Sequence, residues 1–521
     1  MKEPAEAEDP AANAPSEELN DPRSDQHQRC TFKNKKLYRG NTEALGWALD
    51  GVANFAATIA PAAFLSVAVI NLAKREAGCD TEIPPGEVKA PECNERVYGL
   101  RPTSLWTTYG TVVGLISACC LPLVGAVVDY TSHRKRLGFW TALMQIVLLS
   151  ALTFISESNW FIMLILQVLN AFFGWVHTLT AFAYLPELTD DPGLLMSWTA
   201  NFHILQYVSL ILFLALMLVL IRALGFNGDD VLLDDVPSAR LANGSVLAII
   251  IPFYLWTWTS LMEPRDAFHK LPEGSSLWTI GFVKVTKTSK LLFTKYRALM
   301  WFFVDVCLAE ACQQSIATIG LTYMTDTMLM KSSETGIAIL LLFFFGIVGS
   351  SIAKYSVSYM NPIRSNMICQ TFTAINIGIA ALIMTGPGQQ MRAYFMAACW
   401  GIGAGWKNVV ERFITCEIIP KGQDAELMGF YLFSSQILIW LPTLVFTLMN
   451  EAGISQRVGL LTLIVFFLGG MCALCMMGSY DEAMQLAKIE SDKSENYDFD
   501  DHENKKNAQR PPSLSKKSLE E

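Results

Sequence analysis

Long apolar runs recur along most of the chain and are separated by short polar segments. A run of about 18 or more apolar residues with few charges can cross the hydrocarbon core of a bilayer as a helix. We predict about twelve such spans, of which the sixth is short and has an ill-defined start. Their ranges are 44–73, 104–128, 137–156, 160–185, 195–222, 246–262, 298–323, 334–355, 365–386, 390–416, 427–449 and 456–478. A transmembrane β-barrel would show alternating segments of about ten residues instead. The pattern predicts an all-α integral membrane protein.

The spans fall into two groups of six, which we expect to form similar bundles at 44–262 and 298–478. Trp47 and Asp50 open the first bundle, and Trp301 and Asp305 open the second in the same order. This echo fits two parallel repeats related by an axis along the membrane normal.

The segment 263–297 separates the two bundles and is rich in lysine. Within 275–294 it carries Trp278, Phe282, Val285 and Leu292 at helical spacing, with lysines on other sides. This pattern favours an amphipathic helix on the inner membrane surface. The alternative is a plain solvated linker.

Composition supports a membrane protein with polar tails. The chain has 521 residues and 17% charged residues, against about a quarter in soluble proteins. The net charge of -9 comes largely from the tails and one extramembrane loop. We predict that tails 1–43 and 479–521 are disordered, since they lack large apolar residues. No cleavable signal peptide is expected, because the N-terminal stretch has no apolar core.

Lysine and arginine near short loops mark the cytosolic side of a membrane protein. Basic residues precede the first span, follow the second and fill the central linker. These segments fall on one side of a twelve-span chain, so both termini should be cytosolic. Cys79 and Cys93 then share the first non-cytosolic loop, where they form a disulfide or remain two free thiols.

Polar side chains inside the spans concentrate on the first and fourth spans of each half, which predicts a translocation cavity. The candidate substrate-binding residues are Asp50, Asn54, Asn170, Glu310, Gln313, Gln314, Lys407 and Glu411. The residues nearer the cytosolic third, which suit a gate or proton relay, are His177, Asp305 and Arg412. Structural alternatives remain for some of them. Asp305 and Arg412 could form a buried pair, His177 could be a hydrogen-bonded interior histidine, and the two glutamines could join helices.

A zwitterionic solute needs a cation for its carboxylate and an acid for its amine. Lys407 is the candidate cation because it lies mid-span, and Asp50 and Glu310 are the candidate acids. Pairing of Lys407 with Glu411, four residues later, is the alternative role for this lysine.

The segment after the second span runs from Gly125 through Asp129 to the basic cluster Arg134, Lys135 and Arg136. It resembles the signature loop of the major facilitator superfamily, although Ser132 and His133 replace the usual Gly and Arg. We expect Gly125 to allow close helix approach, Asp129 to bond a neighbouring helix end and the basic cluster to hold the cytosolic surface. The resemblance implies the major facilitator fold.

Two further segments, 46–54 and 420–431, resemble the autophagy-related protein 22 family of vacuolar effluxers. The first reads Gly-Trp-Ala-Leu-Asp-Gly-Val-Ala-Asn and the second opens with Pro-Lys-Gly-Gln-Asp. This resemblance implies a vacuolar or other endomembrane protein that releases amino acids to the cytosol.

We therefore expect a secondary active transporter that moves small polar solutes, above all neutral amino acids, by alternating access. A proton is a possible coupled ion, and the bilayer is the expected environment. Transport of another small solute, or a receptor that keeps the fold without transporting, are the alternatives. No nucleophile–base set, metal cluster or phosphate-binding loop is visible, so neither an enzyme, a cofactor nor a nucleic-acid partner is expected.

Overall fold

The computed structural model describes residues 41–79, 93–185, 188, 192–226, 230–267, 271, 276–420 and 424–489. These residues are almost all helical, and the only extended pairing among them is an isolated bridge between Val97 and Leu100. Most of the two predicted tails lies outside the described residues. The exceptions are 41–43 and 479–489, where the prediction of disorder is wrong. Helix α2 begins at Thr42, and 480–489 is helical and packs Tyr480 and Ala483 onto the core of the second half. The bundle therefore extends further than the predicted boundary at 478.

Each of the first six predicted spans corresponds to a helix. They are α2 (Thr42–Ala60) continued by a π-helical turn and α3 (Ser66–Glu76), then α4 (Pro102–Tyr130), α5 (Arg134–Leu152), α6 (Trp160–Phe182), α7 (Pro192–Ala223) and α8 (Val236–Trp256) with a π-helical turn at each end. The sixth span was expected to start at 246 but begins at Val231. Its early polar side chains, including Asp235 and Asn243, are buried against protein, so a hydropathy pattern does not include them.

The linker forms α9 (Leu277–Thr294), and six predicted spans follow it. They are α10 (Arg297–Asp326), α11 (Ser332–Tyr359), α12 (Pro362–Ile383), α13 (Gln390–Ile418), α14 (Asp424–Ile437) with α15 (Trp440–Glu451), and α16 (Gln456–Met477). The eleventh span is thus broken into two helices. Among the described residues, 10 helices are long and apolar enough to cross a membrane. The other two predicted spans are α5 and α13, and α13 carries the charges of the site.

Local sequence signals fix where several helices begin. The side chain of Asn41 accepts a hydrogen bond from Ala44 N, and that of Asn361 accepts one from Ile363 N. Such caps satisfy amides that have no partner within the helix. Pro102 and Pro362 occupy first-turn positions, where the missing N–H costs nothing.

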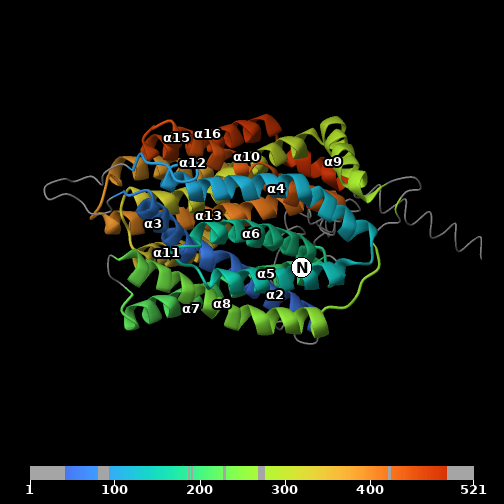
Figure 1. Cartoon of the computed structure of the whole chain (residues 1–521). Coiled ribbons are helices and arrows are strands. Elements are labelled where there is room, and N and C mark those ends of the chain that lie inside the picture. The colour runs from blue at the N-terminus through green and yellow to red at the C-terminus, as the bar shows by residue number, and fades with distance from the viewer. Residues whose placement is uncertain are drawn as a thin grey trace, which may run out of the picture.

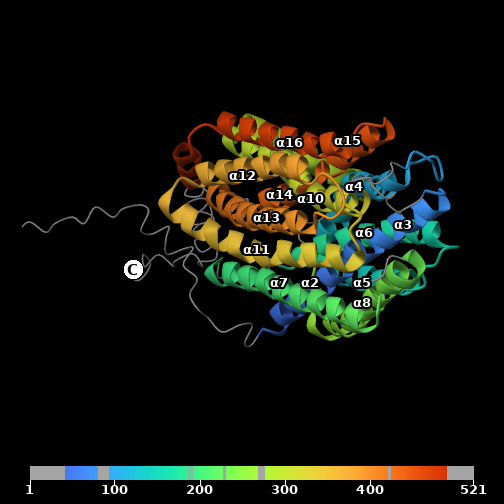
Figure 2. The same ribbon diagram turned by 90° about the vertical axis from the view of Figure 1, so that its left-hand side faces the viewer.

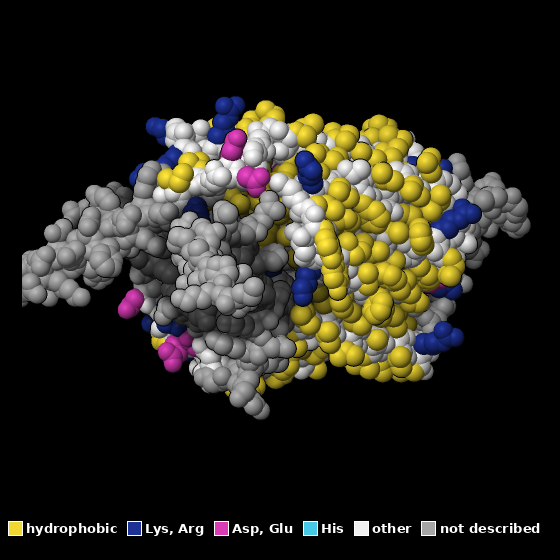
Figure 3. Space-filling model, turned by 180° about the vertical axis from the view of Figure 1, so that it is seen from behind, with side chains coloured by type: hydrophobic (Ala, Val, Ile, Leu, Met, Phe, Trp, Pro, Cys, Tyr) yellow, Lys and Arg dark blue, Asp and Glu magenta, His cyan; other side chains and the backbone are white. Residues whose placement is uncertain are grey.

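The helices run side by side along one direction, with α3 and α9 near opposite ends (Figure 1). Buried residues between 44 and 262 form one hydrophobic cluster, and those between 292 and 483 form two others. Helices α7 and α11 lie side by side where the two groups meet (Figure 2). A broad hydrophobic face is bordered by Lys and Arg side chains (Figure 3), as a lipid-facing perimeter requires.

Glycines hold α11 and α13 in direct backbone contact. A Cβ on Gly405 would lie 1.9 Å from Gly346 O, and one on Gly349 would lie 2.0 Å from Ile402 O. Only residues without a side chain permit this approach. The contact fixes the position of α13, which carries Lys407, so the glycines of this segment tighten the packing.

Candidate functional site

Lys407 lies between two carboxylates in the interior of the second half. Its Nζ donates to Glu310 Oε2 at 2.5 Å and also to Glu411 Oε2. The side chains of Lys407, Glu310 and Glu411 are 1%, 11% and 2% exposed. Gln314 donates to the second oxygen of Glu310, and Tyr431 donates to that of Glu411. The buried charges are therefore paired and hydrogen-bonded, as a low-dielectric interior demands.

Helix α10 directs Asp305 and Glu310 to different neighbours. Asp305 is fully buried and accepts hydrogen bonds from Gln370 at 2.7 Å and Asn366 at 3.0 Å, both on α12. Glu310 faces α13 instead. Asp305 is anchored by amides of α12, a role that sequence reasoning missed because both amides lie in a span without charges.

Asp50 and His177 form a second buried network, in the first half. His177 Nε2 lies 2.9 Å from Asp50 Oδ1, which also accepts the indole N–H of Trp258 at 2.7 Å. The other ring nitrogen lies 2.8 Å from the hydroxyl of Thr141. One ring proton is enough for this pattern, with Nε2–H donating and Nδ1 accepting. Asp50 therefore bonds within its own half, whereas sequence reasoning offered it as an acid facing the substrate.

Two further polar groups extend this interior. Asn54 donates to Thr178 at 2.6 Å and accepts from Gln145 at 3.3 Å. Asn170 donates to Gln167 at 3.2 Å. Gln145 was not expected to take part, because it is a lone amide in a third span whose other polar side chains are mostly hydroxyls.

The predicted site residues divide by accessibility. Gln314 is exposed, and Asn54, Gln313 and Arg412 are partly exposed. The buried members are Asp50, Asn170, His177, Asp305, Lys407 and Glu411, with Glu310 just inside the buried class. Within the described part of the chain, Asn170 Oδ1 and Gln313 Oε1 are buried acceptors that no donor reaches. Such acceptors suit a bound solute amine or water.

The two halves are joined at the end that carries the Cys79–Cys93 disulfide, in which the Cα atoms are 5.6 Å apart. Lys74 of α3 pairs with Asp326 of α10 at 2.6 Å. Helices α4 and α15 are linked by a ladder of hydroxyl and amide hydrogen bonds. Its pairs are Thr107–Thr447 at 2.7 Å, Thr111–Thr443 at 3.1 Å and Asn450 with Thr103 and Ser104 at 2.7 Å. We call these contacts between the two halves the seal. The sequence did not predict them, because they join residues hundreds of positions apart.

The signature loop lies at the opposite end and differs from expectation in two respects. Asp129 pairs with Lys284 of α9 at 2.7 Å, so its partner is a side chain in the linker and not a helix end. A Cβ on Gly125 would meet no atom within 4 Å, so this glycine permits no close approach here. The basic cluster is divided. Arg134 is buried near the Tyr184 ring, Lys135 reaches Thr259 O at 3.5 Å, and Arg136 is exposed.

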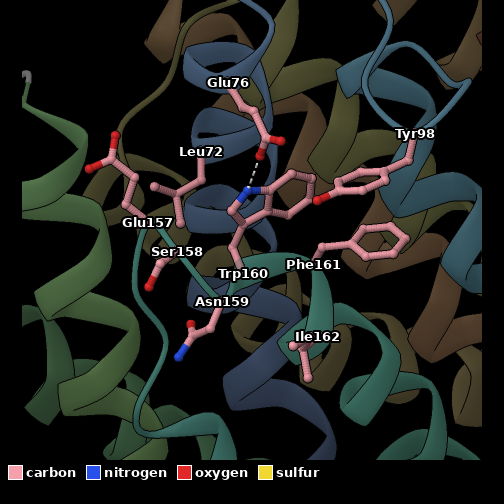
Figure 4. Close-up of a pocket in the computed structure, with 9 residues that line it drawn as sticks. All are labelled: Leu72, Glu76, Tyr98, Glu157, Ser158, Asn159, Trp160, Phe161 and Ile162. Atoms are coloured by element: carbon pink, nitrogen blue, oxygen red, sulfur yellow. Dashed lines mark hydrogen bonds between the residues drawn. The ribbon is translucent and has the colours of Figure 1, made fainter.

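A recess of about 320 Å³ lies at the disulfide end, between α3 and the start of α6 (Figure 4). Its lining includes Glu76, whose carboxylate accepts the indole N–H of Trp160 at 2.6 Å. None of the predicted site residues lines it. We therefore place the candidate site at the charged cluster of the second half.

The helix order and the apolar helices define a multi-pass membrane protein with the major facilitator fold. Three solved structures support the fold at low sequence identity. The transporter PepTSo of the POT family has a TM-score of 0.58 and 11% identity, covering 85% of this chain and 98% of its own. A D-xylose-proton symporter has a TM-score of 0.57 and 11% identity, covering 84% of this chain and 97% of its own. A mutant of the nucleoside transporter NupG has a TM-score of 0.56 and 14% identity, covering 84% of this chain and 100% of its own.

The family follows from the sequence itself. Residues 39–203 and 199–486 match the family described as vacuole effluxer Atg22 like. The chain belongs to this family, as the two resembling segments predicted. A comparison with curated protein sequences gives no match.

Proposed function

We propose that this protein is a secondary active transporter that moves small polar solutes across an internal, vacuolar membrane by alternating access. Neutral amino acids are the preferred class. The observation that carries the proposal is the Glu310–Lys407–Glu411 cluster, buried inside a membrane bundle and bordered by the exposed Gln314. Ionisable groups at such depth are costly and are typical of transport pathways. The family description as a vacuole effluxer supports the location and the direction of solute movement.

The geometry suggests a division of roles within the site. Glu310 and Gln314 contact the solute amine, since they border accessible space, and Asn54, Asn170 and Gln313 provide further polar contacts. Lys407 is enclosed by two carboxylates, so its main role in this conformation is to hold the Glu310 side chain in place. Protonation of either glutamate would free a Lys407 donor for a solute carboxylate. Proton binding and solute binding would then be coupled at one cluster.

Transport by purified protein in proteoliposomes tests this proposal. We expect saturable counterflow of labelled neutral amino acids, with a rate that depends on an imposed pH gradient. Glu310→Gln should abolish movement, while Glu157→Gln, at an exposed ion pair with Arg75, should not. Binding of an amino acid without movement in any gradient would identify a receptor, and movement of a different solute alone would overturn the substrate class.

Membrane orientation follows from the positions of the basic residues. We predict that both termini face the cytosol. Epitope tags at each end should be accessible to antibody when only the plasma membrane is permeabilised. A tag engineered into the 80–92 loop between Cys79 and Cys93 should be accessible only after the internal membrane is also opened. A protected C-terminal tag would contradict this orientation.

A further inference from the structure

Helix α9 presents three faces with different chemistry. The docked face packs on α4 and, through Leu292, on the core of the second half, with Ile280, Gly281, Thr288 and Leu292 buried. The contact is close, because a Cβ on Gly281 would lie 2.1 Å from Pro122 O. Lys284 adds the 2.7 Å ion pair with Asp129. Lys284 and Asp129 are 31% and 24% exposed, and such pairs contribute little on their own.

The second face of α9 is aromatic and uncovered. Trp278, Phe282 and Phe293 are 75%, 46% and 68% exposed. These three side chains share one side of the helix, since their positions are separated by near-whole numbers of turns. The third face carries Lys287 and Lys290, both exposed. Large aromatic side chains beside lysines are typical of helices that lie in the membrane interface.

The position of α9 along α4 agrees with a location in the membrane interface. Pro122, which Gly281 contacts, lies eight residues before Tyr130 at the end of α4, or about 12 Å along the helix axis. The first turns of α9 therefore lie beside the last two turns of a membrane-spanning helix. That is the level at which headgroups meet acyl chains, so α9 is not a solvated linker.

We propose that α9 binds anionic phospholipids of the leaflet at this end of the molecule. The aromatic face enters the boundary between headgroups and acyl chains, and Lys287 and Lys290 contact lipid phosphates. Charge complementarity favours this occupant, because lysines beside a membrane attract anionic lipids. Bound lipid holds α9 on α4 and so keeps Lys284 against Asp129. Since α9 is followed directly by α10, lipid charge thereby influences how the two halves are tethered.

Hydrogen exchange of the full chain in nanodiscs tests the proposal independently of any transported solute. The amides of 277–294 should exchange several-fold more slowly in phosphatidylcholine with phosphatidylserine than in phosphatidylcholine alone. The double substitution Lys287→Ser with Lys290→Ser should remove this difference, and so should Trp278→Ser with Phe293→Ser. High salt should also reduce it, because screening weakens contacts between exposed charges.

Matched controls lie elsewhere on the same end of the molecule. Arg364→Ser at the start of α12 and Tyr359→Ser at the end of α11 replace exposed residues of similar chemistry and should leave the lipid effect intact. Equal exchange of 277–294 in both lipid mixtures would overturn the proposal. Protection that depends on protein concentration and not on lipid charge would also overturn it, by assigning the aromatic face to a second copy of the chain.

Discussion

Lys407 has two carboxylates within hydrogen-bond distance, so these three groups carry a net charge of minus one when all are ionised. Near the middle of its span, the lysine cannot reach either interface, since each is roughly 15 Å away in a hydrocarbon core of about 30 Å. A proton on either glutamate would make the cluster neutral. We propose that the cluster exchanges a proton through Glu310, whose side chain is the most exposed of the three at 11%.

We predict that Lys407→Met alone strongly destabilises the protein. It leaves two buried carboxylates without their cation, and breaking a buried pair in this way costs about 3–5 kcal/mol. The triple variant Lys407→Met, Glu310→Gln, Glu411→Gln should recover most of the unfolding midpoint, measured by thermal denaturation in detergent. The same variant should neither bind nor transport solute, because the Glu310 carboxylate is gone. Normal transport by the triple variant would limit the cluster to a structural role.

The indole of Trp258 is predicted to stabilise the Asp50 network. Trp258→Phe removes the donor to Asp50 Oδ1 and leaves a buried carboxylate oxygen with one donor fewer. The expected loss is about 1–3 kcal/mol of unfolding free energy, measured by chemical denaturation. Trp256→Phe provides the control, because Trp256 is exposed in the same segment. Equal losses of unfolding free energy from the two substitutions would contradict a stabilising role for the hydrogen bond from Trp258 to Asp50.

At the scale of helices, the apolar runs indicated a helix at each of the twelve predicted positions, of which ten, among the described residues, are long and apolar enough to cross a membrane. Hydropathy did not locate the start of the sixth span, because polar residues such as Asp235 and Asn243 are buried there against protein. The polar residues within the spans pointed to four helices as carriers of the candidate site, which stays a prediction. The sequence could not assign Glu310 to Lys407, since these residues lie 97 positions apart and only the packing of α10 on α13 brings them together.

Glycine packing gives the next prediction. Gly405→Ala should force α11 and α13 apart, because its Cβ would lie 1.9 Å from Gly346 O. We expect a lowered thermal midpoint and lost transport, since α13 carries Lys407. Gly125→Ala should leave the midpoint unchanged, because that Cβ meets no atom within 4 Å. A comparable loss of stability in both variants would contradict the role of close contact, since alanine itself favours a helix over glycine.

The Asp129–Lys284 pair joins the linker helix to α4, far from the charged cluster. We predict that Asp129→Asn slows transport but leaves equilibrium solute binding nearly unchanged, because the pair acts on movement between conformations. Transport rate in proteoliposomes and binding by isothermal titration would be measured on the same preparation. Complete loss of binding by a well-folded variant would contradict this role.

For the molecule as a whole, alternating access requires the two halves to separate at the end where they are now joined. The seal includes the Lys74–Asp326 pair and the hydrogen bonds between α4 and α15. Each of these bonds connects one half to the other, so opening this end would break them together. Under the proposed mechanism, transport would depend on a contact that is stable enough to close and weak enough to release.

Cross-linking the seal tests this directly. Thr107 and Thr447 have hydroxyl oxygens 2.7 Å apart across the two halves, so the pair Thr107→Cys with Thr447→Cys should form a disulfide. On a background whose other free cysteines are replaced, oxidation should abolish transport and reductant should restore it. The matched pair Ser356→Cys with Ser365→Cys has oxygens 2.6 Å apart, but it joins α11 to α12 within one half. Oxidation of that pair should leave transport largely intact, since neither helix crosses the seal. If the oxidised Thr107–Thr447 variant still transports at the rate of its reduced form, the halves do not separate at this end, and rocking about the charged cluster is not how the protein works.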